Sequence, residues 1–312
     1  MQYCFGVDVG GTTVKMGLFT NAGELMDKWE IPTRTQENGS HILPDIAESI
    51  NAKLIEKKID KSEVLGMGIG VPGPVTDDGV VLQCVNLYWG RVDVASKMKE
   101  LTGLTVKVGN DANVAALGEA WMGGGKGFSD VIMVTLGTGV GGGIILNGSI
   151  VTGTKGAAGE IGHMLVNYEE TDSCNCGKKG CLEQYASATG IVKETKRLLA
   201  SCDTPSALRD LKELTAKDVF DLAKTGDELA EQSVQQLCRY LAIACSHVSA
   251  VVDPQVFVIG GGVSKAGTII TENVSKYYDG YVMMALRNKE FRLAELGNDA
   301  GIYGSAKLAL GK

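Results

Sequence analysis

The 312-residue sequence has no apolar stretch long enough to span a bilayer, and its first residues lack the basic start and apolar core of a signal peptide. It also has no basic run, and a formal net charge of −7 argues against general affinity for nucleic acid. We therefore expect a cytoplasmic protein with neither a membrane nor a nucleic-acid partner. Histidine is scarce, with three in the chain, so a histidine beside several cysteines is informative.

That combination lies in the segment Glu160–Glu183, which is bracketed by two carboxylates. Buried free cysteines are common in protein cores, but the polar and charged neighbours here would make a poor core strand. Four side chains supply the ligand number of a closed tetrahedral zinc site. The predicted ligands of a structural Zn²⁺ are His163, Cys174, Cys176 and Cys181. A metal here would also fix the positions of the carboxylates of Glu160 and Glu183.

The 42 glycines gather in clusters, and the first cluster, Gly10-Gly11, follows an apolar strand. A Rossmann loop or a P-loop would place a helix after such glycines. Instead, Val14, Met16 and Leu18 alternate with less apolar residues, which is the period of a strand. The pattern predicts a β-hairpin whose turn is built from glycine.

The cluster Gly137–Gly143 repeats this strand, turn and strand when Gly137 is aligned with Gly10, which suggests an internal duplication. Coincidence between two ordinary hairpins is the alternative. A third cluster, Gly260–Gly262, also follows an apolar strand. Backbone N–H groups exposed in such turns bind phosphate without any side chain. Three of these turns predict that a nucleoside triphosphate binds between two lobes.

Two acidic residues stand at positions that suit phosphoryl transfer. Asp8 lies beside the first glycine turn, where it could hold Mg²⁺ through water or simply accept hydrogen bonds from its own turn. Asp111 follows a strand and begins a probable helix, as a capping residue would. The same position would let its carboxylate orient a substrate hydroxyl and accept the proton. The residues alone leave both alternatives open.

Beyond these clusters, the chain resembles the ROK family of sugar kinases and repressors, within the actin-like ATPase superfamily, over nearly its full length. The combination of E-I-G-H with C-x-C-G-x-x-G-C is highly specific to that family. The matching motifs are D-V-G-G-T-T-V-K (Asp8–Lys15), G-V-P-G-P-V (Gly70–Val75), N-D-A-N (Asn110–Asn113), L-G-T-G-V-G-G-G (Leu136–Gly143), G-A-A-G-E-I-G-H (Gly156–His163), C-N-C-G-K-K-G-C-L-E, I-G-G-G-V-S and D-A-G-I-Y-G-S-A (Asp299–Ala306).

The resemblance implies an ATP-dependent glucokinase that phosphorylates the 6-hydroxyl of glucose, with Asp111 as the catalytic base. It also implies that His163 takes part in both the zinc site and the sugar site. The predicted sugar contacts are Gly70, Asn86, Asn110, Asp111, Glu160, His163 and Glu183. The predicted contacts to ATP and Mg²⁺ are Asp8, Gly10, Gly11, Thr12, Thr13, Lys15, Gly137, Thr138, Gly139, Gly260, Gly261 and Gly262.

Two alternatives remain. Kinases of N-acetylmannosamine, N-acetylglucosamine or other hexoses share much of the pattern, although G-A-A-G-E-I-G-H favours glucokinase. A non-catalytic, sugar-responsive regulator is the second alternative. Family repressors carry a DNA-binding helix-turn-helix before the first hairpin, and eight residues up to Asp8 give no room for one. Ten residues separate His163 from Cys174, where nine are commoner in the family, so we expect the loop to bulge.

The resemblance further implies an α/β protein with the two-lobed actin-like ATPase (ribonuclease H-like) fold, with a cleft between its lobes. We expect a small lobe at residues 1–116 that is joined by a C-terminal helix at residues 298–312. We expect a large lobe at residues 117–297 that carries the zinc loop. Because relatives are often dimers, we also expect a homodimer.

Overall fold

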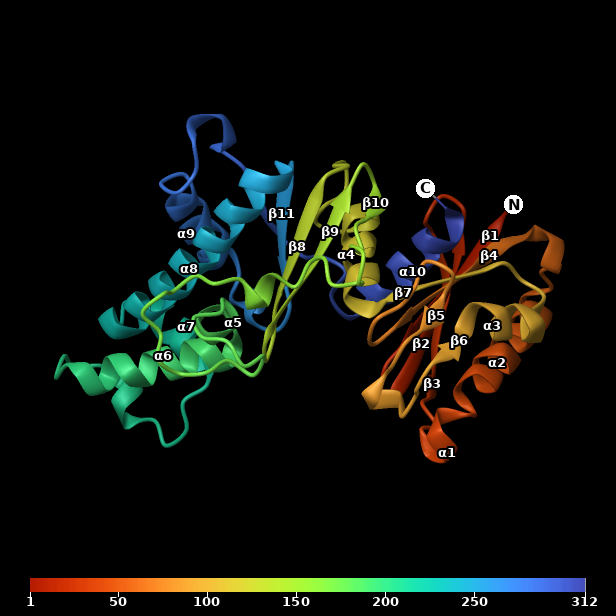
Figure 1. Cartoon of the computed structure of the whole chain (residues 1–312), viewed down its shortest axis with the longest axis horizontal. Coiled ribbons are helices and arrows are strands. Elements are labelled where there is room, and N and C mark those ends of the chain that lie inside the picture. The colour runs from red at the N-terminus through yellow and green to blue at the C-terminus, as the bar shows by residue number, and fades with distance from the viewer. Residues whose placement is uncertain (312) are drawn as a thin grey trace. The chain divides into compact units, whose positions relative to one another are not determined.

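A computed structural model describes residues 1–311 (Figure 1). Lys312, the last residue of the predicted C-terminal segment, lies outside the described residues. The strands are β1 (Tyr3–Val9), β2 (Thr13–Thr20), β3 (Leu25–Pro32), β4 (Val64–Val71), β5 (Val80–Val81), β6 (Val92–Asp93), β7 (Val106–Asn110), β8 (Val131–Leu136), β9 (Val140–Leu146), β10 (Ser149–Ile150), β11 (Val256–Gly260) and β12 (Glu290–Leu293). The α-helices are α1 (Gln36–Gly39), α2 (Ile42–Lys57), α3 (Val94–Thr102), α4 (Asp111–Met122), α5 (Glu183–Ala186), α6 (Ala188–Ser201), α7 (Ala216–Lys224), α8 (Glu228–Val252), α9 (Thr268–Tyr278) and α10 (Ala300–Leu310).

The chain forms two compact units, and each is described by itself. The first unit holds Met1–Ser129, Gly143–Ala158 and the residues from Leu296 onward, and the second holds Asp130–Gly142 and Gly159–Glu295. The first unit thus includes residues 117–129 and 143–158, which the sequence predicts to lie in the large lobe. The physical reason is that α4 is continuous across the predicted boundary at residue 116 and packs tightly against α10.

The first sheet has the strand order β3-β2-β1-β4-β7. The strands β1 and β2 pair antiparallel across the turn at Gly10 and Gly11, so the predicted hairpin is confirmed. On the other side, β4 and β7 run parallel to β1. The second sheet has the order β10-β9-β8-β11-β12, in which β8 pairs parallel with β11 and β11 with β12. The two orders match strand for strand, which supports the predicted duplication.

Alternation along β1 decides what lies on each face of the first sheet. Phe5 and Val7 are fully buried in a core that includes residues of α2 and α3. Cys4 is buried on the opposite face, in a cluster with Ile302 and Ala306 of α10. Because Asp8 is an even-numbered residue of the same strand, its side chain also lies on the face that α10 covers.

Glycines let α10 lie directly against the strands. A Cβ atom on Gly6 would lie 1.9 Å from the carbonyl oxygen of Ile302, and one on Gly68 would lie 1.8 Å from that of Ser305. No side chain fits into such spacing. The hydroxyl of Ser305 donates a 2.7 Å hydrogen bond to the carbonyl oxygen of Val7 and fixes the position of α10 along the strand.

In the second unit, the apolar strand β11 is buried along its whole length, as expected for a strand covered on both faces. The helix α8 begins at Glu228 because Asp227 caps it by accepting a hydrogen bond from the N–H of Ala230. None of the helices within residues 1–311 is both long and apolar enough to cross a membrane.

Candidate functional site

Three predicted site residues of the first unit lie at the carboxyl ends of neighbouring parallel strands. Asp8 of β1 is opposite Gly70 of β4 in the sheet register. The next residue of β4, Val71, is opposite Asn110 of β7. Ligand sites in open α/β sheets form outside such strand ends. Residues from three separated parts of the sequence are thus brought together by the register.

The capping role at the start of α4 belongs to Asn110. Its side-chain oxygen accepts hydrogen bonds from the N–H groups of Ala112 and Asn113, at 3.1 and 3.2 Å. Its side-chain nitrogen donates to the carbonyl oxygen of Gly73 at 3.1 Å and to the Asp111 carboxylate at 3.0 Å. The cap is therefore satisfied without Asp111, and the carboxylate of Asp111 is held by its neighbours.

The carboxylates of Asp111 and Asp8 interact electrostatically. Burial raises the pKa of Asp111, and hydrogen bonds from the N–H of Ala112 and from Asn110 oppose that shift. The pKa of Asp8 is raised to about 6, first by burial and then by the negative charge of Asp111, while the positive charge of Lys15 opposes the rise. Two half-buried carboxylates that repel each other favour a cation between or beside them.

Asp8 also depends on a glycine at the start of α10. A Cβ atom on Gly301 would lie 2.5 Å from the Asp8 carboxyl carbon. Lys15 is opposite Asp8 on β2, and its ammonium group donates to the carbonyl oxygen of Asn298 at 3.1 Å. The position of the Asp8 carboxylate is therefore set by β1, β2 and α10 together.

The first glycine turn is closed by a 3.0 Å hydrogen bond from the N–H of Gly10 to the carbonyl oxygen of Thr13. Gly11 and Thr12 at its tip are exposed. A Cβ atom on Gly11 would lie 3.7 Å from the Cβ atom of Asn86. Asn86, predicted as a sugar contact, therefore lies beside the predicted phosphate turn.

The corresponding turn of the second unit joins β8 to β9. The N–H of Gly137 donates to the carbonyl oxygen of Gly139 at 2.9 Å. The start of α6 lies against this turn, because the N–H of Ala188 donates to the carbonyl oxygen of Gly137 and the Thr189 hydroxyl donates to that of Thr138, both at 2.8 Å. Nothing in the local sequence around Thr189 points to the glycine turn, so this contact is not predictable from the sequence.

The third glycine cluster follows β11. Gly261 has a φ of +85°, and a Cβ atom there would lie 2.5 Å from the carbonyl oxygen of Leu136, one residue before Gly137. Its neighbour Gly260 is opposite Thr135 of β8 in the register. The second and third glycine clusters therefore lie together at the ends of β8 and β11, and only glycine satisfies both the backbone angle and the close approach at residue 261.

Glu183 contacts the second glycine turn. Its Oε2 atom accepts a 3.0 Å hydrogen bond from the N–H of Val140, and a Cβ atom on Gly139 would lie 2.0 Å from Oε2. Glu160 is exposed and precedes the short 3₁₀ turn Ile161–His163. Glu183 thus connects two predicted parts of the site, the nucleotide turn and the sugar contacts.

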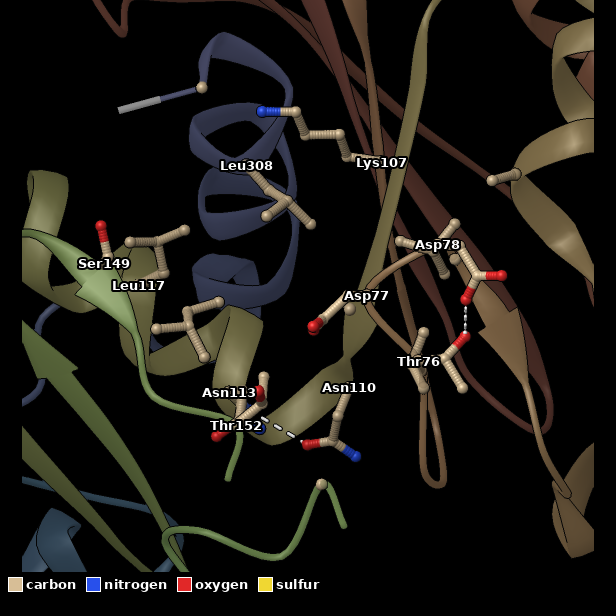
Figure 2. Close-up of a pocket in the computed structure, with 18 of the residues that line it drawn as sticks. Thr76, Asp77, Asp78, Lys107, Asn110, Asn113, Leu117, Ser149, Thr152 and Leu308 are labelled. Atoms are coloured by element: carbon tan, nitrogen blue, oxygen red, sulfur yellow. Dashed lines mark hydrogen bonds between the residues drawn. The ribbon is translucent and has the colours of Figure 1, made fainter. Parts of the chain in front are cut away.

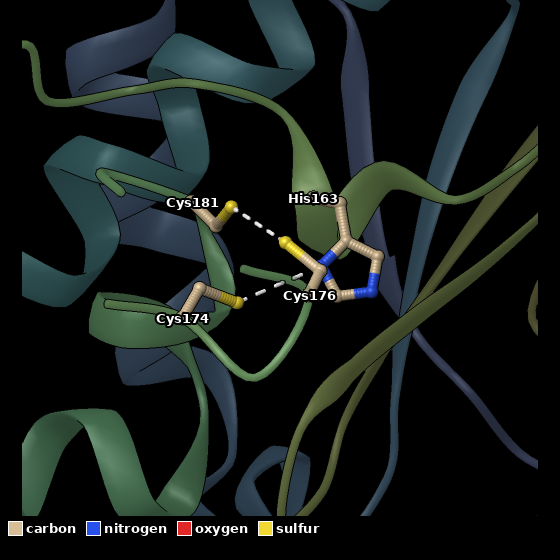
Figure 3. A group of neighbouring side chains, drawn as sticks. All are labelled: His163, Cys174, Cys176 and Cys181. Carbon is tan, nitrogen blue, oxygen red and sulfur yellow. Dashed lines mark hydrogen bonds between the residues drawn. The ribbon is translucent and has the colours of Figure 1, made fainter. Parts of the chain in front are cut away.

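The predicted zinc ligands meet in the second unit (Figure 3). The ligand atoms of His163, Cys174, Cys176 and Cys181 all lie within 4.8 Å of one another. The Sγ atoms of Cys176 and Cys181 are 3.6 Å apart, and Sγ of Cys174 is 3.8 Å from Nδ1 of His163. Tetrahedral zinc with Zn–S bonds of about 2.3 Å separates its sulfur ligands by about 3.8 Å. The residues therefore fit a zinc ion in donor type, number and spacing.

The histidine ring is oriented for two partners. Figure 3 shows Nδ1 of His163 facing the sulfurs and the other ring nitrogen pointing away from them. The ring can therefore bind a metal through Nδ1 while Nε2 remains available to another group. Glu183 is close to the same cluster, with its Oε1 atom 3.9 Å from Sγ of Cys174.

A cavity of about 490 Å³ lies within the first unit (Figure 2). The hairpin residues 75–79, β7, α4, α10 and residues 148–156 contribute to its walls. Of the predicted site residues in the described chain, Asn110 alone lines it. Behind Asn110 lies Asn113, whose buried Oδ1 atom has no hydrogen-bond partner among the described residues. This cavity therefore adjoins the first turn of α4 but does not gather the predicted sugar contacts.

Comparisons with known proteins identify the family of this chain. The model of the ROK family matches residues 4–312. A glucokinase of Halalkalibacterium halodurans is 45% identical over 98% of this chain and 94% of its own length. A glucokinase of Thermotoga maritima is 34% identical over 97% of this chain and 96% of its own. The crystal structure of a ROK family glucokinase from Streptomyces griseus in complex with glucose and AMPPNP is 32% identical, with a TM-score of 0.70 and 98% coverage of both chains.

Proposed function

Because the chain belongs to the ROK family, we propose that it is a glucokinase, which transfers a phosphoryl group from ATP to the 6-hydroxyl of glucose and releases ADP. The observation that carries this conclusion is the 45% identity with a glucokinase over 98% of the chain. The similarity to a glucokinase solved with glucose and an ATP analogue supports the same substrates. It also supports the two-lobed actin-like ATPase fold.

We assign the catalytic base to Asp111. Its carboxylate begins α4 at the end of β7 and is held by the Asn110 amide. Phosphoryl transfer needs little basicity from such a group, because the transition state is loose and position matters most. Its role is to orient the sugar hydroxyl and to accept the proton as the new O–P bond forms. The bond from the phosphorus to the ADP oxygen breaks in the same transfer.

We assign the remaining contacts by unit. In the first unit, the proposed sugar contacts are Gly70, Asn86 and Asn110, and the proposed ATP and magnesium contacts are Asp8, Gly10, Gly11, Thr12, Thr13 and Lys15. In the second unit, the proposed sugar contacts are Glu160, His163 and Glu183, and the proposed ATP contacts are Gly137, Thr138, Gly139 and Gly260–Gly262. Adjacent sugar hydroxyls suit carboxylates and amides, and a hydroxyl that is missing leaves a buried partner unpaired. Magnesium bound near Asp8 would neutralise phosphate charge when present.

We further propose that His163, Cys174, Cys176 and Cys181 hold a structural zinc ion. The support is their spacing, described above, and the closed donor set of one imidazole and three thiols. When bound, zinc would fix the orientation of the His163 ring, so that Nε2 presents a defined hydrogen bond to the sugar. The metal would order the sugar pocket without contacting the phosphate.

A homodimer is the proposed assembly, and its supporting surface lies on the second unit. Four tyrosines, Tyr168, Tyr240, Tyr277 and Tyr281, line a groove of about 860 Å³ together with Arg239. Tyrosine and arginine are enriched in protein interfaces. Light scattering coupled to size exclusion should show a dimer that Tyr281→Arg weakens. A monomeric wild type would reject this assembly.

We propose a cytoplasmic location, where ATP is supplied.

The test of function is ADP release with Mg²⁺-ATP and a panel of glucose, mannose, fructose, N-acetylglucosamine and N-acetylmannosamine. We expect glucose to give the highest kcat/KM. Turnover led by an N-acetyl sugar would keep the fold and the mechanism but change the substrate. No turnover with any sugar, in folded protein that binds glucose, would point to a regulator and overturn the enzyme assignment.

A further inference from the structure

A buried carboxylate stands in the loop that joins His163 to Cys174. The side chain of Glu170 is only 2% exposed, although glutamate is rarely buried unless it is paired. Its partner is Arg197 of α6, whose guanidinium donates two parallel hydrogen bonds to the carboxylate, at 2.9 and 3.0 Å. Such a fork-to-fork pair is geometrically specific as well as strong.

The Glu170 carboxylate also accepts hydrogen bonds from groups other than Arg197. The hydroxyl of Tyr185 on α5 donates to Oε2 at 2.6 Å. The backbone N–H groups of Thr171 and Asp172 both donate to Oε1 at 2.9 Å. The pKa of Glu170 is held far below its usual range, chiefly by Arg197. The carboxylate therefore stays ionised and ties the loop backbone to α5 and α6.

The same guanidinium also holds the far end of this loop. Arg197 donates to the carboxylate of Asp172 at 2.6 Å, and Lys193 pairs with that carboxylate at 2.8 Å. Arg197 also donates to the carboxylate of Glu194 at 2.8 Å, and that carboxylate accepts a second hydrogen bond from Gln236 of α8 at 3.1 Å. One arginine thus connects residues 170 and 172 to two long helices.

A short chain of hydrogen bonds continues from this pair into the metal cluster. The side-chain nitrogen of Gln184 donates to the carbonyl oxygen of Asp172 at 3.0 Å. The side-chain oxygen of Gln184 accepts from the N–H of Cys181 at 3.1 Å. Gln184 follows Glu183 directly on α5. The position of a predicted zinc ligand and that of a predicted sugar contact therefore depend on the same scaffold.

We propose that Arg197 and Glu170 act as positioning residues, forming a clamp that holds the loop between His163 and Cys174 in its folded path whether or not metal is bound. The effect of the clamp on metal affinity rests on the proposed zinc site. With the clamp in place, the cysteines are pre-arranged and zinc binds without having to fold the loop first. This also explains how a ten-residue connection is accommodated, since the turn at Tyr168 and Glu169 projects outward while residue 170 is anchored.

Arg209 offers a matched control for Arg197. Arg209 stands in the 3₁₀ turn Ala207–Asp210 and donates to the carbonyl oxygen of Leu199 in the last turn of α6, at 2.9 Å, and to that of Thr204 beyond the helix, at 3.0 Å. The variants Arg197→Met and Arg209→Met therefore each remove one positive charge that contacts the C-terminal part of α6. Only Arg197→Met removes contacts to the loop between His163 and Cys174. Arg197→Lys keeps the charge but not the fork, and should restore the wild-type behaviour only in part.

The experiment measures two properties of these variants. Hydrogen–deuterium exchange on metal-free protein should rise in peptides spanning residues 164–172 for Arg197→Met and stay at the wild-type level for Arg209→Met. Transfer of zinc to a chromophoric chelator should be about 10- to 100-fold faster for Arg197→Met, as for other losses of outer-shell support. Wild-type protein without zinc would overturn the zinc site but leave the exchange test valid. Equal exchange in the two methionine variants would overturn the clamp.

Discussion

The side chain of Asn110 donates a 3.0 Å hydrogen bond to the carboxylate of the residue that follows it, Asp111. The same asparagine caps α4, so the helix cap and the proposed catalytic base are two adjacent residues. Because the cap does not need Asp111, the carboxylate can be altered without loss of the helix start. This separation makes the proposed catalytic base testable.

We expect Asp111→Asn to lower kcat by at least about 100-fold, because an amide cannot accept the hydroxyl proton. Glucose binding should remain within a few-fold, since the new side chain still accepts hydrogen bonds. Coupled ADP-release kinetics and calorimetric titration of glucose would measure both quantities. Asp93→Asn is the matched control, because Asp93 caps α3 at an exposed position and should be catalytically silent. Equal activity of the two variants would disprove the assignment.

Gly301→Ala should weaken the binding of Mg²⁺-ATP. Alanine favours a helix interior over glycine by roughly 1 kcal/mol, so helix propensity alone predicts a stabler protein. The new methyl group would instead lie 2.5 Å from the Asp8 carboxyl carbon and displace it. We expect the KM for ATP to rise, with the KM for glucose less affected. Gly90→Ala is the control and should leave both constants unchanged, because a Cβ atom added at Gly90 has no atom within 4 Å other than those of its chain neighbours.

Removal of zinc should raise the KM for glucose more than the KM for ATP. The proposed metal orients the His163 ring, whereas the glycine turns are built from backbone alone. Cys176→Ser is the direct variant, because Cys176 is exposed and its loss creates no core cavity. Cys202→Ser, outside the cluster, is its control. Elemental analysis should find about one zinc per wild-type chain and little in Cys176→Ser. If both variants kept wild-type zinc, the ligand set would be incorrect.

The activity should fall as the pH drops through about 6, where Asp8 takes up a proton. Because protons and Mg²⁺ compete for the same carboxylate, raising the Mg²⁺ concentration should shift the acid limb of kcat/KM to lower pH. If the acid limb of kcat/KM did not shift with the Mg²⁺ concentration, the proposed binding of Mg²⁺ near Asp8 would be rejected.

The contribution of Asp8 to the free energy of unfolding should become more favourable as the pH falls, opposite to its effect on activity. The folded pKa of Asp8 exceeds its ordinary value of 3.8, so ionisation of Asp8 costs folding free energy. That cost is present above pH 6 and is lost as the pH falls from about 6 towards 4. Asp8→Asn should therefore flatten this part of the stability curve in urea titrations at several pH values.

Several features were predictable because their signals are local. Strand periodicity on both sides of Gly10 and Gly11 predicts the first hairpin, and the structure confirms it. The spacing of His163 and the three cysteines predicts a cluster that the structure brings together. In each case a turn or a periodic pattern over a few residues is sufficient to define the element.

Only the tertiary structure could decide what these elements contact. The predicted boundary at residue 116 falls within α4, which lies wholly in the first unit. The packing of α4 against α10 depends on Gly118 and Gly304, which are nearly two hundred residues apart in the sequence. The pairing of Glu170 with Arg197 and the glycine that makes room for Asp8 are also invisible in the sequence. The sequence by itself determined the glycine hairpins and the grouping of His163 with three cysteines, because these depend on near neighbours. Sheet register and helix packing decided the rest, because they join residues whose separation along the chain carries no local pattern.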